Sequence, residues 1–215
     1  QWVTFIHGAG GSSKIWFKQI KAFTANYNVL LIDLRGHGES KGMFDTVKQY
    51  SFRCISEDVI DVLDFLKIKQ SHFVGISLGT IIIRNIAEIQ PSLVKSMIMA
   101  GAILKFNLMS QILMRVGYIL HRVLPHMAIY KSFALIILPR RKHKSSRNVF
   151  VNEAKKLFRK EFIRWYKLTS DVNPLLRSFR RKKINKPSLF IMGGEDYMFL
   201  SAVELFVQRN FLAQL

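Results

Sequence analysis

One serine in this chain, Ser77, lies in a pattern that could make it a nucleophile. It is the middle residue of Gly75–Gly79, which reads G-x-S-x-G. The apolar run 72–74 precedes this pattern, and the run 81–87 after it can continue as a helix. A strand that enters a helix through a one-residue corner exposes the corner side chain, and the flanking glycines let strand and helix approach closely. With the helix N-terminus behind it, Ser77 is suited to nucleophilic attack.

Three further loops of small and polar residues each follow a strand-like run. They are His7–Gly11 (HGAGG), Asp33–Ser40 (DLRGHGES) and Gly193–Asp196 (GGED). With the serine pattern, their order and spacing resemble the α/β-hydrolase superfamily, in its serine-nucleophile, cap-bearing branch, from about Val3 to Leu215. The resemblance implies the α/β class and an α/β-hydrolase fold: a mostly parallel, doubly wound sheet with a helical cap insertion. The alternation of apolar strands and helices independently favours such a sheet.

The resemblance also assigns roles to single residues. Ser77 is the expected nucleophile, and Asp196 the acid that orients a catalytic histidine, with Glu195 as the alternative. The backbone N–H groups of Ala9 and Leu78 are the expected oxyanion hole, with Gly10 as the alternative to Ala9. Such donors must face a carbonyl oxygen as it gains charge. The loop histidines His7 and His37 are expected to be structural.

A serine hydroxyl needs a base, normally a histidine held by a carboxylate. In the family this histidine follows the acid, but here all six histidines precede it: His7, His37, His72, His121, His126 and His143. We therefore expect the catalytic histidine beyond Leu215. The alternatives are His121 and His126 in the cap.

The chain begins in a strand-like run, and a helix is expected from Ser201 to its end, so we interpret it as a fragment of a longer polypeptide. We expect a hydrolase core in 1–102, a basic helical cap in 103–186 and a second, truncated part of the core in 187–215. Residues 103–186 carry 21 Lys and Arg against 3 Asp and Glu, which is +18 of the net charge of +19.

The expected cap contains two or three amphipathic helices in 103–138, a basic loop in 139–147 and a helix in 155–165 with Phe158, Phe162 and Trp165 on one face. An apolar cap face would shape a pocket for an acyl or alkyl group. The basic outer surface is a solvated face or a docking site for an anionic membrane surface. Nucleic acid is not expected, because no reading module is present.

Composition limits the remaining possibilities. The single cysteine, Cys54, allows no intrachain disulfide and suits a reducing compartment. The carboxylates of 57–64 form a solvated helix face rather than a metal site, and no cofactor or metal is expected. We expect a cytoplasmic protein, peripheral to the membrane if the cap docks there, and the sequence indicates no oligomeric state.

These observations predict a serine hydrolase, a carboxylesterase or lipase-like enzyme that cleaves an ester with an apolar acyl or alkyl part through an acyl-enzyme. The same motifs serve carbon–carbon bond hydrolases, thioesterases, acyltransferases and perhydrolases, because a fold does not fix its chemistry. A non-catalytic member that holds a ligand in the same pocket is the alternative from another class.

Overall fold

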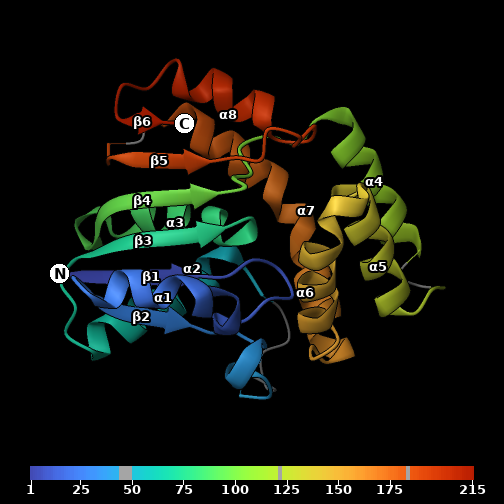
Figure 1. Ribbon diagram of the computed structural model, residues 1–215, viewed down its shortest axis with the longest axis horizontal. Helices are drawn as coiled ribbons and strands as arrows, with labels where there is room; N and C mark the ends of the chain where they lie inside the picture. The colour runs from blue at the N-terminus through green and yellow to red at the C-terminus, as the bar shows by residue number, and fades with distance from the viewer. Residues whose placement is uncertain (44–49, 121–122, 183–184) are drawn as a thin grey trace.

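The computed structural model describes residues 1–43, 50–120, 123–182 and 185–215. In these ranges six strands form one sheet in the order β2-β1-β3-β4-β5-β6 (Figure 1). Every pair is parallel, as predicted for a doubly wound fold. The strands are β1 (Trp2–Ile6), β2 (Asn28–Ile32), β3 (Ser71–Ile76), β4 (Val94–Ala100), β5 (Ser188–Ile191) and β6 (Ala213–Gln214).

Helices cover both faces of this sheet. One apolar cluster joins Val3, Phe5 and Val74 to Trp16, which belongs to the short helix η1 (Ser13–Trp16) ahead of α1 (Phe17–Thr24). The larger cluster lies on the opposite face, where Ile6 and Phe73 pack with residues of α2 (Phe52–Phe65), α3 (Leu78–Ile89) and α8 (Leu200–Val207). The remaining short helices of the core are η2 (Gly38–Ser40) and η3 (Pro91–Leu93).

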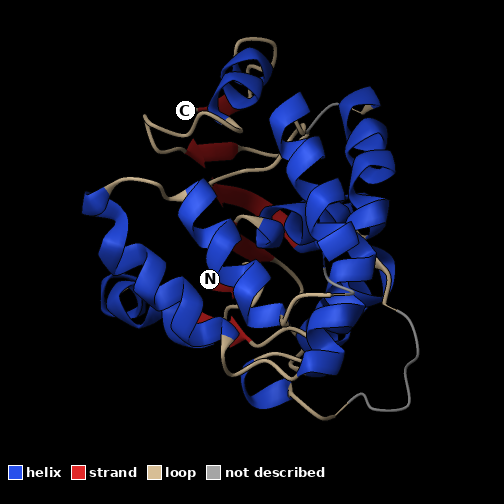
Figure 2. Ribbon diagram, turned by 90° about the vertical axis from the view of Figure 1, so that its right-hand side faces the viewer, coloured by secondary structure: helices blue, strands red, loops and turns tan. Residues whose placement is uncertain are grey.

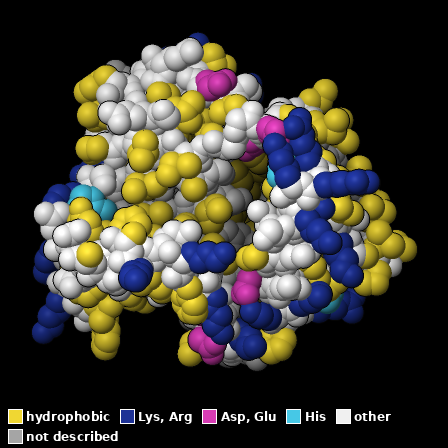
Figure 3. Space-filling model, in the orientation of Figure 1, with side chains coloured by type: hydrophobic (Ala, Val, Ile, Leu, Met, Phe, Trp, Pro, Cys, Tyr) yellow, Lys and Arg dark blue, Asp and Glu magenta, His cyan; other side chains and the backbone are white. Residues whose placement is uncertain are grey.

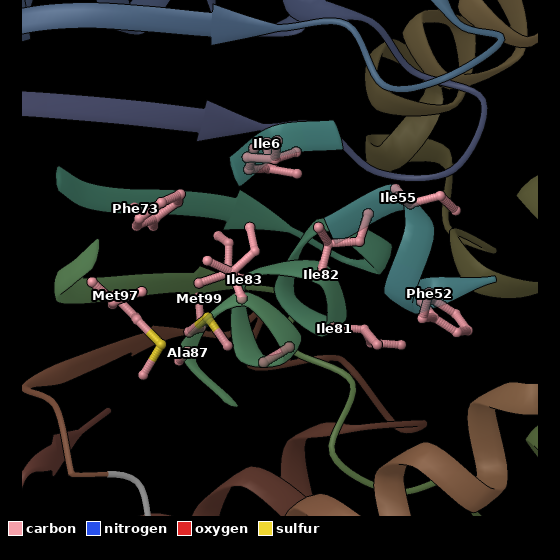
Figure 4. Packing of buried hydrophobic residues seen from close by; sticks show 14 of the residues in the cluster. Ile6, Phe52, Ile55, Phe73, Ile81, Ile82, Ile83, Ala87, Met97 and Met99 are labelled. Atoms are coloured by element: carbon pink, nitrogen blue, oxygen red, sulfur yellow. The ribbon is translucent and has the colours of Figure 1, made fainter. Parts of the chain in front are cut away.

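The centre of the larger cluster is α3, which is buried on almost every side. Figure 4 shows its isoleucines between the strands and α2, with Ile83 beside Phe73 and Met99. Ile81, Ile82 and Ile83 are each at most 1 % exposed. A fully buried Ile contributes about 1.5–3 kcal/mol to folding, so these three side chains hold the start of α3 firmly against the sheet.

The cap helices are α4 (Leu108–Leu120), α5 (His126–Ile137), η4 (Arg141–His143), α6 (Lys144–Ala154) and α7 (Arg159–Arg181). In Figure 1 the strand arrows point toward these helices. In Figure 2 the side of the molecule that carries the cap helices faces the viewer. Part of the cap has a core of its own, in which Tyr130 packs with Phe162 and Tyr166. Other side chains of α7 belong instead to the large core cluster: Trp165, Leu168, Val172, Leu176 and Phe179. One helix thus joins cap and core, and the boundaries at 102/103 and 186/187 remain a prediction.

Three local predictions are wrong. The predicted basic loop 139–147 is largely helical, because η4 occupies Arg141–His143 and α6 begins at Lys144. Phe158 lies just before α7 and is 47 % exposed, whereas Phe162 is buried. The last predicted helix ends at Val207, and Ala213–Gln214 instead extends the sheet by pairing with β5. Pairing at a free sheet edge overrides the local preference of so short a segment.

None of the helices in the ranges described is long and apolar enough to cross a membrane.

Candidate active site

Ser77 occupies the corner between β3 and α3, as the pattern predicted. Its backbone has φ 52° and ψ −118°, a combination that is rare for a residue with a side chain. Such strain costs about 1–3 kcal/mol and persists only where the surroundings enforce it. The side chain is half-buried at the N-terminus of α3. The hydroxyl is therefore presented at the end of a buried strand.

The neighbouring glycines make this corner possible. A Cβ on Gly79 would lie 2.5 Å from the carbonyl oxygen of Ile6, and one on Gly75 would lie 2.4 Å from Cδ1 of Ile83. Hydrogen bonds then fix the turn: Ser77 N–H donates to the Ala100 carbonyl at 2.9 Å. The Thr80 hydroxyl donates to the Ser77 carbonyl at 2.6 Å.

The loop His7–Gly11 lies directly beside the nucleophile, since a Cβ on Gly8 would lie 3.3 Å from Cβ of Ser77. Within this loop the Gly10 N–H donates to Nε2 of His37 at 3.0 Å. Because the Gly10 N–H is already hydrogen-bonded to His37, it is not available as the alternative oxyanion donor. In the described structure the N–H of Ala9 and that of Leu78, the first residue of α3, have no such partner. Leu78 directly follows Ser77 in the chain, and Ala9 follows Gly8, the loop residue that approaches Ser77.

Two buried histidines hold the loops around Ser77. His7 accepts the Leu34 N–H on Nε2 at 3.0 Å, and its Nδ1 donates to the Gly8 carbonyl at 2.7 Å. His37 uses Nε2 for Gly10 and donates from Nδ1 to the Arg35 carbonyl at 3.1 Å.

An acceptor nitrogen requires the neutral ring in each of these histidines. Burial lowers the pKa of His7, and burial with the neighbouring His7 lowers the pKa of His37 to about 3. Both rings are therefore neutral, and both nitrogens of each are used by backbone groups. This is the structural role expected for them.

The cap touches the same loop through Tyr130 of α5. Its hydroxyl donates to the Ala9 carbonyl at 2.5 Å. The contact needs glycine at position 10, where a Cβ would lie 2.0 Å from that hydroxyl and where φ is +68°. Burial raises the pKa of Tyr130, so it remains a protonated donor. Nothing in the sequence pointed to this residue, because 121 positions separate it from Ala9.

A buried polar network fastens α7 to the loop Asp33–Ser40 and its neighbourhood. Glu161 is 1 % exposed, pairs with Arg164 at 2.6 Å and accepts a hydrogen bond from the Tyr50 hydroxyl. Trp165 donates from Nε1 to the Arg35 carbonyl at 3.0 Å. These contacts fix the cap relative to the loop that carries His37.

Asp196 lies in the turn after β5. Its Oδ1 accepts the N–H groups of Met198 at 3.0 Å and Phe199 at 2.9 Å, which orients the carboxylate. The neighbouring Glu195 instead points to the cap, where it binds Lys142 at 2.6 Å, Arg140, and His143 at 3.5 Å. The Lys142 hydrogen bond and the cationic neighbours lower the pKa of Glu195. With Glu195 engaged by the cap, Asp196 suits the role of acid better.

The described histidines offer few bases for Ser77. His7 and His37 are committed to backbone groups, and His72 bonds Ser96 at 2.7 Å and Gln1 at 3.1 Å near the start of β3. His126 lies against the Phe162 ring. The alternative base His121 lies outside the described residues.

His143 is a further candidate base, to which no local pattern in the sequence points. It reaches Glu195 in the acid turn, and its Nδ1 is buried with no hydrogen-bond partner in the described structure. Only the tertiary fold brings this histidine of the cap to the turn that carries Asp196.

Figure 3 shows a hollow between the core and the cap, with hydrophobic side chains at its margin. A separate pocket of about 60 Å³ lies where Gly10 and His37 meet α6, lined also by Lys14, Glu153 and Lys156. This pocket is too small for an acyl chain. Among the residues described, no three His, Cys, Asp or Glu side chains gather as metal ligands would.

Comparison with known proteins agrees with this geometry. A family model described as alpha/beta hydrolase fold matches residues 1–137. The esterase from Exiguobacterium antarcticum superposes with a TM-score of 0.80 at 18 % identity, covering 100 % of this chain and 81 % of that one. At that identity the likeness shows the fold alone.

Two curated relatives match shorter segments. The 3-oxoadipate enol-lactonase 1 of Acinetobacter baylyi is 36 % identical over 77 residues, 36 % of this chain and 27 % of the enzyme. The putative carbamate hydrolase RutD of Pseudomonas savastanoi pv. phaseolicola is 35 % identical over 95 residues, 44 % of this chain and 36 % of that protein. The matched segments thus span at most about a third of these relatives.

Proposed function

We propose that this chain, which belongs to the α/β-hydrolase fold family, is a serine hydrolase that cleaves a carboxylic ester with an apolar acyl or alkyl part. The observation that carries the proposal is the backbone of Ser77, at φ 52° between a buried strand and the N-terminus of a buried helix. Strain of this kind gathers at functional positions. A structural turn would relieve it with glycine, which has no Cβ penalty at positive φ.

In the proposed reaction the Ser77 hydroxyl attacks the ester carbonyl, its proton passes to a base, and the alkoxide leaves with a proton from that base. Water then cleaves the acyl-enzyme by the same steps in reverse. The N–H groups of Ala9 and Leu78 stabilise the oxyanion, and each such donor contributes about 10²–10³-fold to the rate. The Tyr130 hydroxyl donates to the Ala9 carbonyl and His37 accepts the Gly10 N–H, so both ends of the Ala9–Gly10 peptide are held and the loop that carries the Ala9 N–H is kept in place.

Asp196 is the proposed partner of the base, because its carboxylate is oriented by two N–H groups on one oxygen. The base itself is proposed to be a histidine outside Gln1–Leu215. The support is that the nitrogens of His7, His37 and His72 are already hydrogen-bonded. His143 is the alternative inside the chain, because it reaches the acid turn with one nitrogen unpaired.

The substrate class rests on two observations. The names of two relatives denote hydrolysis of an enol lactone and of a carbamate, and both substrates present a carbonyl carbon to a nucleophile. Hydrophobic side chains lie at the margin of the hollow between the core and the cap (Figure 3), and such a margin suits an acyl or alkyl group better than a charged one. Carbon–carbon bond hydrolysis, thioester hydrolysis and acyl transfer use the same groups and remain the alternatives.

The test is hydrolysis of p-nitrophenyl esters of increasing acyl length by the full reading frame and by Gln1–Leu215 with added imidazole. We expect turnover that Ser77→Ala abolishes and that the exposed-serine control Ser92→Ala retains. Loss of activity in His143→Ala would place the base inside the chain. Equal hydrolysis by wild type and Ser77→Ala would refute the nucleophile. A folded protein with no turnover on any ester would favour the other reactions or a ligand-binding role.

A further inference from the structure

The outward face of α4 is apolar. Six large side chains of this helix are exposed to solvent, and we call them the α4 face: Leu108, Met109, Ile112, Val116, Ile119 and Leu120. Leu108 is 73 % exposed and Ile119 is 67 % exposed. A surface helix normally turns its apolar stripe to the core and its polar side to water. This helix also turns an apolar stripe to water, so the exposed stripe needs an explanation.

The inner side of α4 explains why the helix cannot simply rotate. Gly117 is buried, and a Cβ there would lie 2.5 Å from the Tyr166 hydroxyl and 2.9 Å from the Phe133 ring. The Tyr166 hydroxyl also donates to the Met114 carbonyl at 3.0 Å. α5 and α7 therefore meet α4 at its one residue without a side chain. Any rotation that buried the α4 face would place larger residues at this contact.

The apolar surface continues beyond α4. Val123 and Leu124, in the turn before α5, are 81 % and 41 % exposed. Figure 3 shows hydrophobic side chains along the margin of the molecule that α4 forms, beside the Lys and Arg side chains of the cap. The patch thus runs along one edge of the cap.

The segment that contains this patch carries charges of one sign. Residues 103–152 contain nine Lys and Arg and no Asp or Glu. Of these cations, Lys105 just before α4, Arg115 within it and Lys131 on α5 are exposed. Apolar side chains on a segment whose only charges are cationic match a surface that offers hydrocarbon below anionic groups.

We propose that the α4 face docks on an anionic lipid surface. The α4 face would lie in the headgroup region, with Lys105, Arg115 and Lys131 paired with lipid phosphates or carboxylates. The helix has 13 residues, fewer than the about 20 that cross a bilayer, so it lies on the membrane rather than through it. A second copy of this chain is a poorer occupant, because it would bring two surfaces of the same positive charge together. The inference is independent of the proposed function.

The test is flotation of the full chain with vesicles of phosphatidylcholine alone and with phosphatidylserine. We expect binding to the anionic vesicles only, and steep weakening as salt screens the charges. Arg115→Gln should lower the partition coefficient about five-fold, and Lys105→Gln by a similar factor. The double change Ile112→Ser with Ile119→Ser should lower it at least about ten-fold. All variants are checked for an unchanged circular dichroism spectrum.

Matched controls lie on other parts of the molecule. Phe211→Ser removes a side chain that is 94 % exposed after α8, and Lys18→Gln removes an exposed cation of α1. Both should bind like wild type, as should Ser77→Ala. Equal binding to neutral and anionic vesicles, or binding that the isoleucine changes leave intact, would overturn the proposal. So would absence of binding, or dimerisation without lipid that the same changes abolish.

Discussion

Lowering the pH should destabilise the fold through His37, because its ring is buried and neutral. Burial and the neighbouring His7 lower the pKa of His37 to about 3 in the folded chain, against about 6.5 in an unfolded one. Between these values the unfolded chain binds a proton that the folded chain does not. The free energy of unfolding therefore falls as the pH falls below about 6.5.

The size of the effect follows from the difference in pKa. Each pH unit below about 6.5 costs about 1.4 kcal/mol until the folded pKa is approached. At a pH of about 5, His37 alone removes about 2 kcal/mol, from a total stability of about 5–15 kcal/mol for a domain. The pKa of His7 is also lowered by burial, so His7 adds to the loss in the same direction.

The assay is urea unfolding of wild type and His37→Gln at a pH of about 7.5 and about 5. The glutamine amide can accept the Gly10 N–H without a titrating ring. Carboxylates with a lowered pKa, such as Asp33, are present in both proteins and cancel in the comparison. We expect wild type to lose about 2 kcal/mol more than the variant between the two pH values. An equal loss of stability in the two proteins would show that His37 accepts a proton in the folded chain. The assignment of its Nε2 as the acceptor of the Gly10 N–H would then be refuted.

Two further predictions concern the contacts between cap and core. Glu161→Leu removes the buried carboxylate that accepts the Tyr50 hydroxyl. It should lower the free energy of unfolding in urea by about 3–5 kcal/mol, because a buried ionic network loses its acceptor. Tyr130→Phe removes the hydrogen bond to the Ala9 carbonyl and should cost only about 1 kcal/mol of stability. On the proposed function it should also lower kcat for a p-nitrophenyl ester about ten-fold at unchanged KM, because the Ala9–Gly10 peptide is no longer held at its carbonyl and the loop that carries the Ala9 N–H becomes less rigid.

Each of these changes has a matched control. Glu161→Gln keeps an acceptor for Tyr50 and should lose less stability than Glu161→Leu. Glu204→Gln alters an exposed glutamate and should change stability by less than about 0.5 kcal/mol. Tyr27→Phe removes a half-exposed hydroxyl and should leave kcat unchanged. A wild-type kcat in Tyr130→Phe would show that Tyr130 has no role in the proposed reaction. An unchanged free energy of unfolding in Glu161→Leu would show that the network does not hold the cap.

Much of the fold could be predicted because its signals are local. The strands are short apolar runs, and the corner at Ser77 needs glycines two residues to either side, at Gly75 and Gly79. Each of these features depends on only a few neighbouring residues in the sequence. Local signals that agree with one another specify one fold. The order of the four motifs then predicted the parallel sheet, which the structure confirms.

The sequence failed where a distant partner decides the local structure. Ala213–Gln214 looked like the end of a helix, and only the free edge of β5 makes it a strand. The basic run after Pro139 looked like a loop, but α6 begins at Lys144 within the cap. Short segments have weak preferences of their own, so the contacts available to them decide their conformation.

The chemistry of the site divides in the same way. The sequence by itself determined the residue types at the corner, the glycine loop beside it and the acid turn, because backbone geometry demands them in place. Only the tertiary structure decided that His37 takes the Gly10 N–H, that Tyr130 reaches Ala9 and that His143 joins Glu195. Hydrogen bonds act over about 3 Å, and residues so far apart in the chain come that close only when the sheet, the loops and the cap have packed together.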